Sequence, residues 1–294
     1  MSEGTLLRKY ILVSEFLRGN PEDFLWSVKG SEITRVNGQS IVKSATPFDG
    51  YITAMHRNRT IGHIGIAACS APGAALCYET ICAEGPALLG AYEHPEISLH
   101  AVSFAEHVRL LRLNDWAGVG EILLQSAEKL AKIGADFVIC PDNTAHLGLD
   151  FVLARSPIPW LHIADAVAQA AGKAGYRRVG LLGTRALVES SLYPEKLLRE
   201  GIDCCRPSAA DRDTVDRIIF EELVHGRVTS QARAELAAII TRLKENDSCD
   251  AVILGCTELP LAITSDVAVL PTLDSTRLLA RMALERAVAM RSAS

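Results

Sequence analysis

The sequence predicts an α/β fold in which an internal duplication gives two similar parallel-sheet domains with a cleft between them. Three observations predict it. Two stretches of the 294-residue chain resemble each other, and further residues repeat at nearly the same offset. Strand-like and helix-like segments also alternate, which is typical of parallel sheets covered by helices on both faces.

The two similar stretches span residues 135–144 and 249–258. Each has an Asp, a short β-branched run and a break at Pro or Gly, so we interpret each run as a buried strand. Asp142 and Cys256 stand 114 positions apart, at equivalent places after these strands. Because parallel sheets bind ligands outside the carboxyl ends of their strands, we expect a carboxylate and a thiol on opposite sides of one small molecule.

Other elements follow in order along both halves. The first half contains strand-like segments at 63–68 and 97–102 and a helix through residues 77–79. From Asn114 to Ile133 the apolar period is helical, and Gly134 is a natural residue to end that helix. The second half opens at a strand-like segment at 178–183 and contains a helix at about 229–245. The pairs Gly65 and Gly180, and Tyr78 and Tyr193, are each 115 positions apart, which supports a duplication.

The N-terminal residues match neither half. Residues 10–14 are strand-like, and Asn37-Gly38 predicts the turn of a hairpin. We therefore expect an N-terminal extension over residues 1–60 and α/β domains over 61–160 and 161–271. A C-terminal helix within 272–294 is expected to pack back on the first domain.

The composition excludes several classes of function. A net charge of −5 argues against nucleic acid as the main partner. No apolar run has the length of a membrane span, and the first residues lack the order of a signal peptide, so we expect a cytoplasmic protein. The eight cysteines are irregularly spaced, and no Cys or His pair has zinc-ligand spacing. We expect no disulfide framework and no metal.

Cys256 and Asp142 are the candidate proton-transferring groups. Cys256 stands where a strand meets the expected start of a helix, whose backbone N–H groups lower the pKa of a thiol. A buried core role for Cys256 and a helix-capping role for Asp142 remain open alternatives. Ordinary pKa values of about 3.9 for Asp and about 8.5 for Cys predict an ionised Asp142 and a neutral Cys256 at rest.

Short polar residues flank both candidates. Asn143, Thr144 and Thr257 are suited to binding a carboxylate, although capping is again the alternative. Thr184 and Arg185 follow another strand, and Arg185 could grip a substrate carboxylate at two points, a weak indication of an acidic substrate. His146 is a candidate proton shuttle, with a packed or capping role as its alternative.

At these residues the chain resembles the aspartate/glutamate racemase family over residues 61–285. The similar segments are Asn143-Thr144-Ala145-His146 and Gly255-Cys256-Thr257-Glu258, with landmarks at 94–97, 104–106, 182–185 and 271–276. The resemblance implies two Rossmann-like domains, commonly in a homodimer, and amino-acid racemisation without pyridoxal phosphate or another cofactor. It also implies that Asn143, Thr144 and Thr257 hold the α-carboxylate, and that His146 and Glu258 belong to the substrate site.

Two departures from the family leave other functions open. Asp142 stands where the family usually has Cys, or Thr in one broad-specificity branch. Residues 68–73 replace the glycine-rich first loop of the family. Besides a racemase or epimerase that uses Asp142 and Cys256, we therefore consider two alternatives. One is a single-thiol decarboxylase or cis-trans isomerase of a dicarboxylic acid, and the other is a small-molecule binder without turnover.

Overall fold

The structure, a computed structural model, describes residues 32–36, 39–43, 61–264 and 266–290, and the chain forms two compact units, 1–58 and 59–294. In the first unit, strands β1 (Glu32–Val36) and β2 (Gln39–Lys43) pair antiparallel, with Val36 opposite Gln39. The predicted hairpin is confirmed. The predicted strand at 10–14 and the turn residues themselves lie outside the described residues.

The second unit contains two four-stranded parallel sheets of identical strand order. The first sheet runs β4-β3-β5-β6 and the second β8-β7-β9-β10, so each strand of one has a counterpart in the other. This agreement confirms the predicted duplicated α/β fold. The strands are β3 (Ile64–Ala68), β4 (Ile97–Ala101), β5 (Phe137–Ile139), β6 (Trp160–Leu161), β7 (Arg178–Gly183), β8 (Asp203–Cys205), β9 (Ala251–Gly255) and β10 (Thr272–Asp274).

Equivalent residues make the same kinds of contact in both sheets. Asp136 Oδ2 accepts a hydrogen bond from His63 N at 2.6 Å, and Asp250 Oδ2 accepts one from Arg178 N at 3.1 Å. Each Asp thus joins the start of its central strand pair. Gly65 and Gly180 are also matched, because each leaves room for a leucine of the helix above its sheet. The repeated Asp and Gly positions are therefore requirements of the duplicated sheet.

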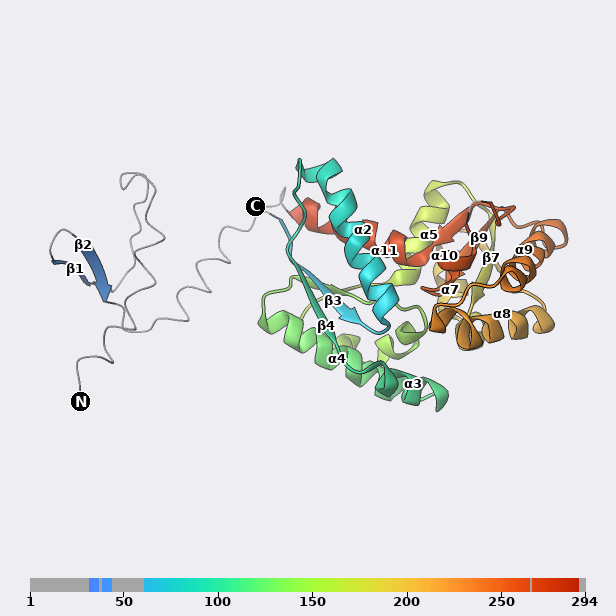
Figure 1. Cartoon of the computed structure of the whole chain (residues 1–294), viewed down its shortest axis with the longest axis horizontal. Helices are drawn as coiled ribbons and strands as arrows, with labels where there is room; N and C mark the ends of the chain where they lie inside the picture. Colours follow the sequence, from blue (N-terminus) through green and yellow to red (C-terminus); the bar gives the residue numbers. More distant parts are fainter. Residues whose placement is uncertain (1–31, 37–38, 44–60, 265, 291–294) are drawn as a thin grey trace. The chain divides into compact units, whose positions relative to one another are not determined.

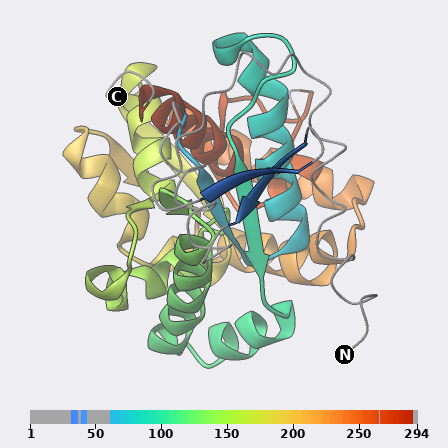
Figure 2. The ribbon, with the colours of Figure 1, turned by 90° about the vertical axis from the view of Figure 1, so that its left-hand side faces the viewer.

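Helices cover both faces of the first sheet (Figures 1 and 2). Helices α2 (Ala71–Leu89) and α11 (Ser275–Met290) pack on the face that presents Ile64, Ile66 and Ile139. Helices α3 (Phe104–Arg112) and α4 (Trp116–Lys132) cover the other face. Helix α4 lies within the predicted 114–133 range, and Gly134 follows it with φ +91°.

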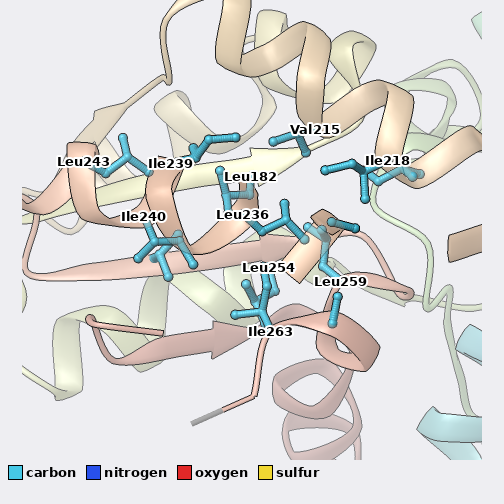
Figure 3. Packing of buried hydrophobic residues seen from close by; sticks show 14 of the residues in the cluster. Leu182, Val215, Ile218, Leu236, Ile239, Ile240, Leu243, Leu254, Leu259 and Ile263 are labelled. Carbon is cyan, nitrogen blue, oxygen red and sulfur yellow. The ribbon is translucent and has the colours of Figure 1, made fainter. Parts of the chain in front are cut away.

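The second sheet is also covered on both faces. Leu182 and Leu254 face α8 (Ala209–Glu221), α9 (Ser230–Glu245) and α10 (Leu259–Ala262), and Figure 3 shows this packing. Leu181 and Ile253 face the opposite side. The helices there are α5 (Ile163–Lys173), α6 (Arg185–Glu189) and α7 (Leu192–Arg199).

Two helices contribute to the cores of both sheets. Ile163 and Ala166 of α5 belong to the core of the first sheet, whereas Val167 of the same helix belongs to that of the second. On α11, Leu279 is buried in the first core, and Leu278 packs against both. The two sheets are therefore parts of one compact body, to which α5 and α11 are common.

The 3₁₀ segment η3 (Thr144–Phe151) follows β5 and packs closely on α4. Gly120 of α4 and Gly148 of η3 face each other, so that a Cβ on Gly120 would overlap the carbonyl oxygen of Gly148. The other 3₁₀ segments are η4 (Leu153–Arg155) and η5 (Leu223–His225). Glycine at both contact positions lets the backbone after Asp142 lie against α4.

We predict that Gly120→Ala lowers the free energy of unfolding by about 1–3 kcal/mol, because the methyl group meets a backbone oxygen that cannot rotate away. Gly172→Ala in α5 is the matched control. Its Cβ would lie 3.2 Å from the flexible carboxylate end of Glu200, and Ala favours a helix by about 1 kcal/mol over Gly. Urea denaturation of both variants is the measurement. A Gly120→Ala protein as stable as the wild type would contradict the proposed close contact.

Candidate active site

A cavity of about 280 Å³ opens at the carboxyl ends of β3, β5, β7 and β9. Its volume is near the lower end of the range for small-molecule pockets, roughly 300–1,000 Å³. Every predicted site residue except His146 lines it. The polar residues that follow the strand ends are Ser70, Asp142, Asn143, Thr144, Thr184, Arg185, Cys256, Thr257 and Glu258.

The remaining wall was not predicted from the sequence. This wall is formed by residues of α3, α6, α8 and η5, together with the first residue of α4, and it is mainly apolar. Its residues are Phe104, Val108, Leu111, Arg112, Trp116, Ala186, Asp216, Ile219, Phe220 and Val224. The apolar period of a helix does not distinguish a side chain that faces a core from one that faces a cavity. The sequence signal here was only the landmark that begins at Phe104.

Cys256 forms a pair with Glu258. Its Sγ donates a hydrogen bond to Glu258 Oε2 at 3.0 Å, and the Thr257 hydroxyl donates to the same oxygen. Burial, followed by the charge and hydrogen bond of Glu258, raises the pKa of the Cys256 thiol well above its ordinary value. The backbone N–H of Glu258 lowers this pKa, as expected of a helix start, but burial and the Glu258 carboxylate outweigh that effect. Cys256 is a neutral thiol at rest, as predicted.

Asp142 forms a second pair, with the buried Cys69. Its Oδ1 accepts a hydrogen bond from Ala145 N at 2.9 Å, and its carboxylate also accepts one from the Cys69 thiol. Burial raises the pKa of Asp142, and the nearby charge of Glu258 raises it further, against the lowering effect of these two donors. The capping role considered from the sequence is therefore present, and Asp142 still lines the cavity.

The loop that replaces the glycine-rich segment of the family connects the two halves of the site. Ser70 caps α2 by accepting a hydrogen bond from Gly73 N at 3.3 Å, and its hydroxyl lies 3.4 Å from Thr257 Oγ1. A Cβ on Gly73 would lie 2.8 Å from Pro141 O and would also collide with the Thr257 methyl. A glycine at position 73 is thus required for this close approach.

Asn143 is held by a buried hydrogen-bond network. The Tyr193 hydroxyl donates to Asn143 Oδ1 at 2.6 Å, and Asn143 Nδ2 donates to Ser275 Oγ at 2.9 Å. Ser275 in turn donates to Leu254 O at 2.8 Å, in the strand that leads to Cys256. Asn143 Oδ1 and one hydrogen of its Nδ2 are therefore engaged within the protein, and these bonds tie the segment after β5 to β9.

Two threonines at the cavity are also paired across the site. The hydroxyl oxygens of Thr144 and Thr184 lie 2.9 Å apart. Thr144 begins η3, and Thr184 caps α6 by accepting a hydrogen bond from Leu187 N at 3.3 Å. Both residues also belong to the cavity lining.

Arg185 is already paired with acidic side chains. Its guanidinium binds Asp213 and lies 3.7 Å from Glu189. Its backbone N–H donates to Asp216 Oδ1 at 2.7 Å. Arg185 lines the cavity as predicted, but these acids compensate its charge, so its presence does not indicate an acidic substrate.

His146 lies outside the cavity lining. Its Nδ1 donates to Asp142 O at 2.7 Å, and its Nε2 accepts a hydrogen bond from Ile163 N at 3.3 Å. Burial lowers its pKa to about 4, so the ring is neutral at pH 7. This arrangement matches the packed alternative considered from the sequence. His146 connects the backbone of Asp142 to the start of α5.

We predict that Tyr193→Phe lowers the free energy of unfolding by about 1–3 kcal/mol, because it leaves the buried Asn143 Oδ1 without its donor. Tyr176→Phe is the matched control, since the Tyr176 hydroxyl has no hydrogen-bond partner among the described residues. Thermal or urea denaturation of both variants checks this. Equal stability of the two variants would show that the network contributes little.

Metal ligation and membrane crossing have no support in the described residues. No group of three or more His, Cys, Asp or Glu in this part of the chain is arranged to hold a metal ion. Among the described helices, none combines the length and apolar composition that a membrane crossing requires. All eight cysteines fall in the described part, and all are free thiols.

Comparison with known proteins gives consistent matches. A family model described as Asp/Glu/Hydantoin racemase matches residues 73–283. A protein from Yersinia pestis described as an Asp/Glu racemase has 32% sequence identity and a TM-score of 0.71, with 78% of this chain and 100% of that one covered. An aspartate racemase homologue from Pyrococcus horikoshii OT3 has 30% identity and a TM-score of 0.67, over 77% of this chain and 99% of the homologue. The broad specificity amino-acid racemase RacX of Bacillus subtilis is 25% identical over 171 residues, which are 58% of this chain and 73% of RacX.

Proposed function

We propose that this chain, which belongs to the Asp/Glu/hydantoin racemase family and is therefore an isomerase, inverts a chiral carbon by moving a proton between Asp142 and Cys256. The substrate would be an amino acid or a close derivative of one, and no cofactor is needed for the step. The Cys256→Ala and Asp142→Asn variants distinguish this two-group reaction from a single-thiol decarboxylation or isomerisation.

The observation that carries this proposal is the placement of the two groups. Asp142 follows β5 and Cys256 follows β9, which are equivalent strands of the two sheets, and both residues line one cavity. A substrate carbon between them has one candidate base on one side and one candidate acid on the other. Inversion needs both, because the proton leaves one face of the carbon and returns to the other.

Each of the two groups has its own role in the proposed proton transfer. In this proposal Asp142 acts in its ionised form and takes the Cα proton, while the Cys256 thiol, whose raised pKa keeps it protonated, gives its proton to the opposite face. The products are a neutral Asp142 and a Cys256 thiolate, and the reverse reaction starts from that state. Glu258 accepts the Cys256 hydrogen bond at rest and thus orients the thiol. It also raises the free energy of the thiolate relative to the thiol.

The developing negative charge on the substrate needs donors as well as a base. Thr144, Thr184, Thr257 and Ser70 place their hydroxyls on the polar side of the cavity. We propose that these hydroxyls donate to the carboxylate or carbonyl next to the reacting carbon. Asn143 acts indirectly, by holding the backbone of this segment in place through Tyr193 and Ser275.

Cys256→Ala is expected to lower racemisation by at least about 1,000-fold, because it removes one of the two proton-transferring groups. The assay is proton NMR in deuterated water, which follows loss of the Cα proton signal, combined with chiral analysis of the substrate. Cys82→Ala, in α2 and outside the cavity lining, is the control and should retain activity. Retained racemisation in Cys256→Ala would refute the proposal.

A single-thiol reaction is the second candidate, and the environment of Asp142 favours it. The Asp142 carboxylate is already bonded to Ala145 N and to Cys69, as expected of a structural cap. Asp142→Asn separates the two functions, because Asn retains the capping oxygen and cannot act as a base. Loss of racemisation supports the two-group reaction. Full activity on a dicarboxylic acid would support a single-thiol decarboxylase or isomerase instead.

The pKa shifts predict the pH profile of kcat/KM. Asp142 must be ionised to act, and its pKa is raised, so activity should fall on the acid side at a pH above the ordinary value of about 3.9. Cys256 must keep its proton, and its raised pKa moves the alkaline fall above the ordinary thiol value of about 8.5. The profile should be the same in both directions, because free enantiomers have an equilibrium constant of one. An alkaline midpoint at or below about 8.5 would contradict these assignments.

The family resemblance leads us to propose a homodimer, which light scattering after size-exclusion chromatography tests. The sequence pattern, without a membrane-length apolar run or the order of a signal peptide, leads us to propose a cytoplasmic location, which fractionation of cells that produce the protein tests.

A further inference from the structure

The cavity has two chemically different sides. Its polar side comes from the residues that follow the strands, including both proton-transferring groups. The opposite wall comes from helices of both halves. Its apolar members are Phe104, Val108, Leu111, Trp116, Ile219, Phe220 and Val224. A substrate carbon held at the polar side would therefore direct its side chain against an apolar surface.

Each half of the site contributes one phenylalanine to this wall. Phe104 begins α3, in the first half, and Phe220 lies near the end of α8, in the second. Their exposed fractions are 42% and 48%, which are high for phenylalanines that line a cavity. A ligand that covers them removes apolar surface from water, which is favourable.

The charges of the lining oppose an acidic side chain. Three carboxyl groups line the cavity, those of Asp142, Asp216 and Glu258. Of the two lining arginines, Arg185 is compensated by Asp213 and Glu189. Arg112, the last residue of α3, is the only cation of the lining without an ion pair among the described residues. A substrate with a second carboxylate would have Arg112 alone as its partner and would meet a surplus of acids.

We propose that the substrate of this site carries an apolar, uncharged side chain on the carbon that is inverted, and that Phe104 and Phe220 select it. This inference rests on the proposed racemase function. A free α-amino acid and a 5-substituted hydantoin share this chemistry, since both place the side chain on a carbon next to a carbonyl or carboxyl group. The experiment distinguishes these two sources.

The test uses the purified full-length chain in deuterated water, with proton exchange and chirality followed together. The panel contains phenylalanine, leucine, 5-benzylhydantoin and 5-isobutylhydantoin, with aspartate and glutamate as acidic comparisons. We expect kcat/KM for at least one apolar compound to exceed that for either acidic amino acid by tenfold or more. Phenylalanine is matched with 5-benzylhydantoin and leucine with 5-isobutylhydantoin. Within each pair, the compound with the higher kcat/KM shows whether the substrate is a free amino acid or a hydantoin.

The other outcomes separate the two proposals. Faster turnover of aspartate or glutamate would overturn the apolar assignment and leave the racemase function intact. In that case Arg112→Gln should abolish the preference for the acidic substrate. No exchange with any compound of the panel would count against the racemase function itself, and the inference would fall with it.

A pair of variants tests the residues that select the side chain. Phe220→Ala should lower kcat/KM for the preferred apolar substrate by about tenfold or more and leave a small substrate, alanine, nearly unchanged. Phe104→Ala, in the other half, should act in the same direction. Phe151→Ala, another exposed phenylalanine but outside the lining, is the matched control. Equal losses for alanine and the apolar substrate, or no loss in either variant, would overturn the assignment.

Discussion

The site depends on the buried network around Asn143. Through Tyr193 and Ser275, this one side chain ties the residues after β5 to α7, α11 and the end of β9. Each polar group in it has a partner, so burial costs little here, whereas loss of one partner leaves another unpaired. Asp142 and Cys256 follow strands of two separate sheets, and this network is one of the buried connections between the segments that carry them.

Each of the two candidate proton-transferring groups is paired with a group of the other kind, a thiol with a carboxyl group. Cys256 donates to the carboxylate of Glu258, and Asp142 accepts from the thiol of Cys69. Both pairs join a thiol and a carboxyl group. The pairing is therefore symmetric, but the groups that face the substrate are not. In the proposed reaction, an Asp142 carboxylate with a Cys256 thiol serves one enantiomer, and the other enantiomer needs the opposite pair, a neutral Asp142 with a Cys256 thiolate.

Much of the fold was predictable because its determinants are local. The Asp and Gly positions that recur near an offset of 114 are each needed once per sheet, and they confirm the duplication. The repeat of Tyr78 and Tyr193 was less informative. Tyr78 is 44% exposed, whereas Tyr193 is fully buried and serves Asn143. Matching positions can thus have different roles.

The site was predictable only as far as its residues follow strands. Asp142 and Cys256 could be found because their place after a strand implies a place at the cavity. The charge compensation of Arg185 could not be predicted from the sequence, since its partner Asp213 lies in another helix. The raised pKa of Cys256 depends on where the carboxylate of Glu258 points, and the sequence carries no signal for that direction. The apolar wall could not be predicted, because its residues follow the same helical period as residues that pack in a core.

The sharing of α5 and α11 between the two cores has a consequence for folding. Unfolding of either half would expose residues that complete the other half, so each half loses part of its own core when its neighbour opens. The two halves would then unfold together as a single cooperative unit, because neither has a complete core without the helices that it shares with the other. Duplication supplied two equivalent strand ends at one cavity, and the shared helices join the sheets that carry them.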